Sequence, residues 1–87
     1  MTPKELHDEI YAWMPEKPKN WREGQAVFNY VDLNYGVARF VQWEDNIDCF
    51  YDDSQIDAFI IKSAERITNY EKYHESKSKS NGKYRGC

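Results

Sequence analysis

The apolar residues of this chain recur at the spacing of an α-helix in three separate stretches, and this periodicity restricts the fold more than any other feature. Within each stretch, apolar residues three or four positions apart share one face of a helix. The three stripes consist of Leu6, Ile10, Trp13 and Met14; of Gly24, Val27, Phe28 and Val31; and of Ile56, Phe59, Ile60, Ala64 and Ile67. The pattern predicts an all-α fold, a small bundle of three to four helices.

Residues that typically start a helix precede all three stripes. Thr2-Pro3-Lys4-Glu5 predicts a capping box with proline at the first helical position, and this helix is expected to end before Pro15. Asn20-Trp21-Arg22-Glu23 predicts a second capping box by the same spacing. Asp53 or Ser54 is expected to cap the last helix, where the acidic side chain also meets the positive end of the helix dipole.

Two glycines and one ambiguous stretch complete the helical pattern. Gly24 lowers helix propensity, so we expect it to allow close approach to another helix, and Gly36 has the position of a helix C-cap. The stretch 37–43 fits either a short helix or strand alternation. Because a lone strand would have no ladder partner, we predict a short helix. The predicted core contains Leu6, Ile10, Trp13, Val27, Val31, Val41, Phe50, Ile56, Phe59 and Ile60.

The charge distribution divides the chain in two. Residues 1–70 hold 7 basic and 13 acidic side chains, whereas residues 71–87 hold 5 basic and 2 acidic ones. Apolar periodicity stops at about Lys72, so we predict a helical domain over residues 1–71 and a flexible basic tail over residues 72–87. The acidic body argues against binding to duplex nucleic acid, because such binding starts by neutralising phosphates.

Several classes of protein are not expected. No apolar run approaches the roughly 18 residues of a transmembrane helix, and the amino terminus does not resemble a signal peptide, so we predict a cytoplasmic protein without membrane attachment. Two cysteines are too few for a disulfide framework. We expect Cys49 to be a buried small hydrophobe and Cys87 to be an incidental terminal thiol.

The sequence gives no support for catalysis or for a cofactor. No nucleophile elbow, zinc-protease motif or phosphate-binding loop occurs. His7 and His74 are far from Cys49 in the sequence, so no Cys–His pair is predicted, and His7 is expected to face solvent. We therefore predict that the chain is not an enzyme and has no cofactor and no metal site.

The most prominent polar feature is a group of acidic residues between the third and last predicted helices. Three interpretations remain open: helix caps in a solvated loop, a divalent-cation site, or an acidic face that meets a basic partner. The calcium-loop pattern is absent. Aromatic rings lie nearby in the sequence, and such rings are typical anchors of protein interfaces. The candidate partner-binding residues are Asp45, Asp48, Tyr51, Asp52 and Asp53.

Two segments carry a resemblance to known proteins. The first is residues 22–30, Arg-Glu-Gly-Gln-Ala-Val-Phe-Asn-Tyr, and the second is residues 48–54, Asp-Cys-Phe-Tyr-Asp-Asp-Ser, followed by Ile56 and Phe59. Together they resemble a group of small uncharacterised proteins of bacteriophages and prophages of gut bacteria. The resemblance covers about half of the chain, roughly residues 20–61. It implies a phage context and carries over no functional residues.

These observations favour one functional hypothesis and leave an alternative. The first is a small phage-type accessory protein that binds a host protein, such as a component of antiviral defence, through the acidic-aromatic surface. This binding would modulate or inhibit the host protein. The alternative is an oligomeric binder that sequesters a nucleotide or signalling molecule, with aromatic rings stacking on the base and Arg22, Arg39 or tail lysines meeting phosphate. The oligomeric state is not predicted.

Overall fold

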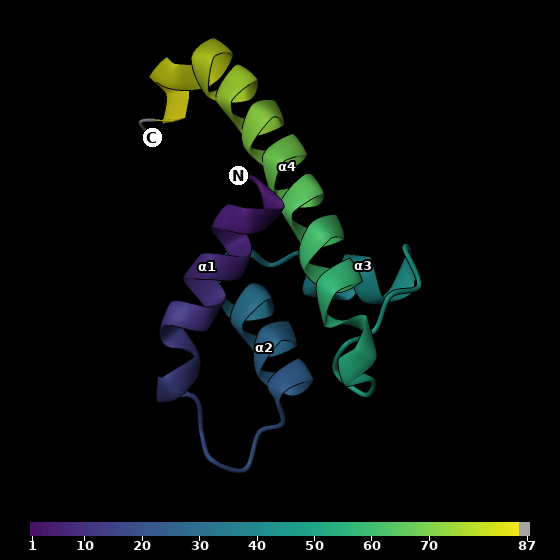
Figure 1. Ribbon diagram of the computed structural model, residues 1–87. Coiled ribbons are helices and arrows are strands. Elements are labelled where there is room, and N and C mark those ends of the chain that lie inside the picture. The colour runs from purple at the N-terminus through teal and green to yellow at the C-terminus, as the bar shows by residue number, and fades with distance from the viewer. Residues whose placement is uncertain (86–87) are drawn as a thin grey trace.

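Four α-helices form the protein in a computed structural model, which describes the backbone of residues 1–85 and the side chains of residues 1–70 (Figure 1). The helices are α1 (Pro3–Trp13), α2 (Glu23–Tyr35), α3 (Ala38–Trp43) and α4 (Ile56–Arg85). Short 3₁₀ turns, Met14–Glu16 and Asp53–Gln55, follow α1 and precede α4. No strand occurs in the described backbone. The predicted all-α bundle is confirmed, and the ambiguous stretch 37–43 forms a short helix, Ala38–Trp43, as predicted.

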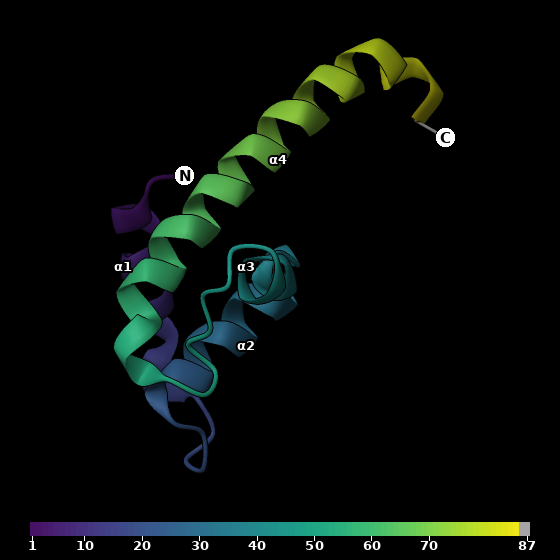
Figure 2. The ribbon, with the colours of Figure 1, turned by 90° about the vertical axis from the view of Figure 1, so that its right-hand side faces the viewer.

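α4 is the element on which the others assemble. It packs against α1, α2 and α3, and α2 also packs against α3. Figures 1 and 2 show α4 crossing the body beside α1 and then leading away from the other helices toward its carboxyl end. The predicted flexible tail, residues 72–87, lies outside the residues whose side chains the structure describes.

Local sequence explains the start of α1 and the end of α2. The Thr2 hydroxyl accepts a hydrogen bond from the Glu5 amide at 3.1 Å, and the Glu5 carboxylate accepts one from the Thr2 amide at 2.8 Å. This capping box is the predicted one. Gly36 ends α2 with a φ of 72°, as predicted, because only glycine adopts this left-handed conformation without a steric cost.

The predicted cap of α2 is wrong. α2 begins after Arg22, and no side chain of its own segment accepts a hydrogen bond there, so Asn20 forms no capping box. The predicted reason for Gly24 is half right: its backbone is closely approached, but by the loop before α4 and not by a helix. Asp52, not Asp53 or Ser54, caps the 3₁₀ turn that leads into α4. The corrections at Asn20 and Gly24 share one cause, because the loop before α4 folds back onto the start of α2.

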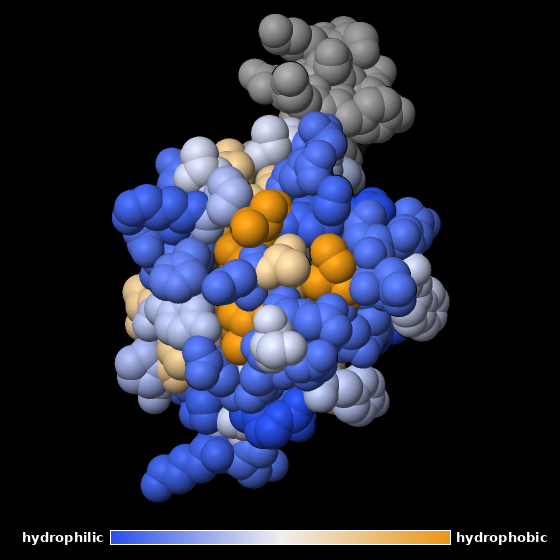
Figure 3. Space-filling view, turned by 45° about the vertical axis from the view of Figure 1, so that its right-hand side comes forward, coloured by the Kyte–Doolittle hydropathy of each residue, from blue (hydrophilic) through white to orange (hydrophobic). Residues whose placement is uncertain are grey.

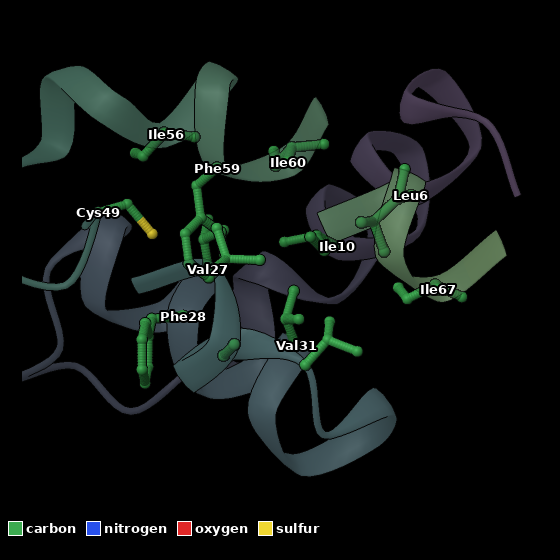
Figure 4. Close-up of a cluster of buried hydrophobic side chains, with 14 residues drawn as sticks. Leu6, Ile10, Val27, Phe28, Val31, Cys49, Ile56, Phe59, Ile60 and Ile67 are labelled. Carbon is green, nitrogen blue, oxygen red and sulfur yellow. The ribbon is translucent and has the colours of Figure 1, made fainter. Parts of the chain in front are cut away.

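The core lies between α4 and the other three helices (Figure 4). Phe59 is fully buried, and its ring lies 5.6 Å from that of Phe28. Cys49 is buried as predicted. Trp13 and Phe50 were predicted as core residues, but both are only half-buried. Trp13 lies against Tyr30 at the edge of the core, with ring centroids 5.0 Å apart. The buried hydrophobic residues are Leu6, Ile10, Ala26, Val27, Phe28, Val31, Val37, Ala38, Val41, Cys49, Ile56, Phe59, Ile60, Ala64 and Ile67.

Candidate functional site

The predicted partner-binding residues lie in the segment that joins α3 to α4, residues 44–55, and we call its residues 44–53 the acidic loop. Asp48 shapes its middle, because its Oδ1 accepts a hydrogen bond from the Phe50 amide at 2.9 Å. Asp52 shapes its end and accepts hydrogen bonds from the amide and the hydroxyl of Ser54, at 3.0 and 2.6 Å. Hydrogen bonds from Ser54 and Gln55 hold the pKa of Asp52 below its ordinary value. Two of the predicted carboxylates therefore stabilise the loop that presents them.

Asp53 has a different structural role, because it ties the acidic loop to α2. Its Oδ1 accepts a hydrogen bond from the Gly24 amide at 3.1 Å and lies 3.6 Å from Nε of Arg22. The Arg22 guanidinium also donates to the carbonyl oxygen of Phe50. The thiol of Cys49 donates to the carbonyl oxygen of Gly24 at 3.3 Å. The loop therefore both accepts hydrogen bonds from the amino-terminal end of α2 and donates one to it, and these bonds fix the loop there.

Asp45 is turned away from the other predicted site residues and toward α4. Its carboxylate accepts a hydrogen bond from Nε of Arg66 at 2.8 Å, and Arg66 also reaches Glu44 at 3.2 Å. This hydrogen bond from Arg66 lowers the pKa of Asp45. The Arg66 guanidinium lies 5.9 Å from the centre of the Phe40 ring. Asp48, Tyr51, Asp52 and Asp53 therefore lie together in the acidic loop. Asp45 belongs to a separate ion-pair network with Arg66.

Large aromatic side chains are exposed on and beside α3. Trp43 and Tyr51 are each 76% exposed, and Phe40 is 51% exposed. Tyr70, on α4, is also exposed. We call Phe40, Trp43, Tyr51 and Tyr70 the aromatic belt. Exposed single hydrophobic residues are ordinary on a protein surface, whereas several large rings on one short helix and its neighbours are not.

Three hollows connect the members of the belt into one surface. Phe40 and Tyr70 line the first hollow, Phe40 and Trp43 line the second, and Trp43 and Tyr51 line the third. Because neighbouring hollows share a ring, the belt is continuous around α3. Glu44 lines the first and second hollows and Arg39 the second and third, so side chains of both charges border the belt.

The first hollow is the largest of these three, with a volume of 580 Å³ between the end of α2, α3 and α4. Its aromatic walls are Tyr35, Phe40 and Tyr70, and its polar side chains include Arg66 and Asn69. Small-molecule sites commonly have volumes of roughly 300–1,000 Å³ and mostly apolar walls. The hollow is therefore large enough for a ligand of nucleobase size.

Three further tyrosines, Tyr11, Tyr30 and Tyr35, are half-buried and form hydrogen bonds within the bundle. The Tyr11 hydroxyl donates to Glu23 at 2.5 Å. Tyr30 and Tyr35 donate to the carboxylate of Glu9, each at 2.7 Å to Oε2. Burial, together with the bond to Glu9, raises the pKa of Tyr30 to about 12. These tyrosines fasten α1 to α2 and are not free for a partner.

Phe40 and Tyr70 are the belt members that sequence reasoning missed. A signal for Phe40 exists: Ala38 and Val41 are the buried residues of α3, and Phe40 follows Ala38 by two positions, about 200° around a helix. Phe40 must therefore point away from the core. No comparable signal separates Tyr70 from a core residue, because it directly follows the last stripe of α4.

Among residues 1–70, the structure describes one cysteine, Cys49, and one histidine, His7. Burial raises the pKa of the Cys49 thiol to about 12, so the thiol is protonated at neutral pH. His7 faces solvent, as predicted, and stacks on Tyr11 with ring centroids 4.5 Å apart. Among the described residues, no three His, Cys, Asp or Glu side chains converge in the way that a metal ion requires. Nor is any helix of the described residues long and apolar enough to cross a membrane.

Comparison with protein-family models, with curated proteins and with solved structures finds no match to this chain.

Proposed function

We propose that this chain is a small protein-binding domain whose contact surface is the aromatic belt together with the acidic loop. The exposure of Phe40, Trp43 and Tyr51 on one continuous surface carries this proposal. Exposed aromatic rings commonly supply most of the binding free energy at an interface, whereas charged residues form its rim and favour the right partner.

The carboxylates beside the belt set the kind of partner. No described Lys or Arg side chain pairs with Asp48 or Asp52, which hydrogen-bond to amides and hydroxyls of their own loop. A partner with an apolar or aromatic centre and basic residues at its edge complements this surface. The function that fits is that of a phage-type accessory protein that binds a host protein in the cytoplasm and modulates or inhibits it, including a component of antiviral defence.

The hydropathy of one face of the molecule favours protein recognition through a few rings over a large aliphatic contact. On the face drawn in Figure 3, hydrophobic residues form separate spots within a mostly hydrophilic surface. An interface built on a few rings and surrounded by polar groups is typical of partners that also exist separately. This argument favours a partner that associates with the folded domain.

A second candidate is a binder of small aromatic ligands, which the 580 Å³ hollow between Phe40 and Tyr70 favours. The rings would stack on a planar ligand, and Asn69 and Arg66 would contribute hydrogen bonds. Arg66 already meets Asp45 and Glu44, so a neutral or cationic ring suits this hollow better than a phosphate.

Native mass spectrometry on the tagged chain, gently purified from the cells in which it acts, tests both candidates. A stoichiometric protein partner is expected, lost in Trp43→Ala/Tyr51→Ala and retained in the matched control Leu33→Ala/Ile61→Ala. Leu33 and Ile61 are also exposed hydrophobic residues, and neither lines a hollow of the belt. If the partner remains bound to the Trp43/Tyr51 variant, the belt is not the contact surface. A bare chain with a bound small molecule, lost in Phe40→Ala/Tyr70→Ala, would establish the second candidate instead.

A further inference from the structure

The third hollow of the aromatic belt has walls from three segments of the chain. α3 contributes Trp43, α2 contributes Phe28, and the acidic loop contributes Phe50 and Tyr51. Trp43 and Tyr51 are the two most exposed rings of the belt. Because one wall belongs to a loop and not to a helix, the shape of this hollow depends on what holds the loop in place.

A single side chain, Arg22, holds the acidic loop on both sides of Tyr51. Its guanidinium donates to the carbonyl oxygen of Phe50, and its Nε lies 3.6 Å from Oδ1 of Asp53. The Phe50 carbonyl belongs to the planar peptide group that joins Phe50 to Tyr51, so the bond from Arg22 restricts the direction of the Tyr51 side chain. A guanidinium presents several donors in one rigid plane and can therefore meet a carbonyl and a carboxylate at once.

Arg22 is fixed relative to the other walls of the hollow. It directly precedes α2, and its carbonyl oxygen accepts a hydrogen bond from the Ala26 amide at 2.9 Å. Phe28 lies on the same helix, and its ring meets that of Phe50 with the centroids 5.4 Å apart. Arg22 itself lines none of the three hollows. It therefore acts on the belt by holding the loop and not by forming a wall.

We propose that Arg22 is a positioning residue for partner binding, because it keeps Phe50 and Tyr51 in place as the loop wall of the third hollow. This inference rests on the proposed function and adds to it a residue outside the contact surface. A wall that is held before the partner arrives need not be ordered during association, and this raises the affinity. No loop residue after Glu44 lines the first two hollows, so they keep their shape without Arg22.

The loop has other contacts with α2, so the loss of the Arg22 guanidinium should loosen the wall without unfolding the bundle. The Gly24 amide still donates to Asp53 at 3.1 Å, and the Cys49 thiol still donates to the carbonyl oxygen of Gly24 at 3.3 Å. Neither contact involves the peptide group that joins Phe50 to Tyr51. The Asp53 side chain is 48% exposed, so water solvates its charge when Arg22 is replaced. Arg22→Gln is therefore expected to fold.

Nuclear Overhauser effects between aromatic rings of the full chain measure the position of the loop wall without any partner. Phe28 provides both the test and an internal control, because its ring lies near Phe50 in the loop and 5.6 Å from Phe59 in the core. In Arg22→Gln, the Phe28–Phe50 cross-peak is expected to be lost and the Phe28–Phe59 cross-peak to remain. Arg22→Lys keeps the positive charge beside Asp53 and should lose less of the signal.

Lys4→Gln is the matched control, because it also removes one positive charge and one exposed ion pair, that of Lys4 with Asp8 at 2.8 Å. Both cross-peaks should keep their intensity in this variant. An unchanged Phe28–Phe50 cross-peak in Arg22→Gln, or its equal loss in Lys4→Gln, would overturn the positioning role. Loss of both cross-peaks in Arg22→Gln would also overturn it, because Arg22 would then support the whole bundle.

Native mass spectrometry of the same variants, purified from the cells in which the chain acts, measures the contribution to binding. The dissociation constant of the partner should rise about tenfold in Arg22→Gln, which corresponds to about 1.4 kcal/mol, and should not change in Lys4→Gln. A partner that is lost in Trp43→Ala/Tyr51→Ala but binds Arg22→Gln as it binds the wild type would overturn this inference and leave the proposed function intact. A partner that remains bound to Trp43→Ala/Tyr51→Ala would instead overturn the proposed function, while the cross-peaks still decide whether Arg22 holds the loop.

Discussion

The carboxylate of Asp53 accepts a hydrogen bond from the backbone amide of Gly24 at 3.1 Å, so a residue 29 positions later in the chain caps the start of α2. The first amides of a helix need such an acceptor, because no intrahelical partner is available to them. The same contact closes the acidic loop against α2. The stability of α2 and the shape of the loop therefore depend on one another.

Replacing Gly24 by alanine should destabilise the protein, although alanine is the better helix former. A Cβ at position 24 would lie 2.1 Å from the carbonyl oxygen of Cys49 and 2.4 Å from Oδ1 of Asp53, so the loop would have to move. Steric overpacking of this kind costs about 1–3 kcal/mol, and the bond to Asp53 would be lost as well, whereas the gain in helix propensity is about 1 kcal/mol. Urea denaturation should show a lower free energy of unfolding.

Gly36→Ala is the control for this prediction, because no atom beyond the neighbouring residues of the chain lies within 4 Å of a Cβ at that position. Its cost comes from the positive φ alone and should be about 1–2 kcal/mol. Only Gly24→Ala should also change the fluorescence or the proteolysis of the acidic loop. An unaltered loop in Gly24→Ala would contradict the close approach.

Acid should weaken the protein partly through Asp45. The hydrogen bond from Arg66 lowers the pKa of Asp45 in the folded state. A lowered pKa means that the ion pair contributes fully above the unfolded value, about 3.9, and is lost as the pH falls through the folded value. Since Asp45 is 18% exposed and Arg66 29%, a contribution of about 1 kcal/mol is expected.

Urea midpoints should be measured from neutral pH down through this acidic range. At neutral pH the wild type should be more stable than Asp45→Asn, and this difference in stability should shrink as the pH falls below about 4. Arg66→Gln should behave in the same way. A difference that persists at low pH would mean that the contribution of Asp45 does not come from its charge.

Ser63→Ala should stabilise the protein. Ser63 is fully buried in α4, and its hydroxyl has no hydrogen-bond partner among the described atoms. A buried polar group without a partner costs about 1–3 kcal/mol, and alanine removes it without opening a large cavity. An increase of about 1 kcal/mol in the free energy of unfolding is expected. A clear loss of stability would show that the hydroxyl is hydrogen-bonded in solution.

Alkaline pH should weaken the contact between α1 and α2 through Tyr30. Burial, with the hydrogen bond to Glu9, raises the pKa of Tyr30 to about 12. A raised pKa means that the contribution to stability is complete below the unfolded value of about 10 and is lost as the pH rises through the folded value. The free energy of unfolding of the wild type should fall over this range more steeply than that of Tyr30→Phe. Equal slopes would contradict the role of Tyr30.

The elements of this fold that could be predicted are those whose causes are local. Thr2 and Glu5 stand three residues apart and cap α1 by themselves, and Gly36 ends α2 by its own conformational freedom. The start of α2 could not be predicted, because its cap comes from Asp53 and depends on tertiary contact. Asn20 has the right residue type and spacing for a cap, but the folded loop supplies another acceptor.

The candidate site could be predicted only in part, because some of its features have local causes and others depend on tertiary contacts. The position of the acidic loop could be predicted because the loop connects two predicted helices. Tyr51 is exposed because it lies in this connection. The ion pair of Asp45 with Arg66, 21 residues later, depends on how α3 lies against α4 and leaves no local pattern. Trp13 was expected in the core because it lies on the first apolar stripe, but the edge of a small bundle covers Trp13 and Phe50 only in part.

The hydrogen bonds of Asp48, Asp52 and Asp53 to backbone amides give Tyr51 a fixed platform before any partner arrives. Ordering a flexible loop during association costs conformational entropy and therefore lowers the affinity. Because this loop is already ordered, a partner immobilises little more than the Tyr51 side chain itself. Association should then resemble the docking of two rigid bodies. Nearly all of the free energy gained by burying the Tyr51 ring should then lengthen the lifetime of the complex.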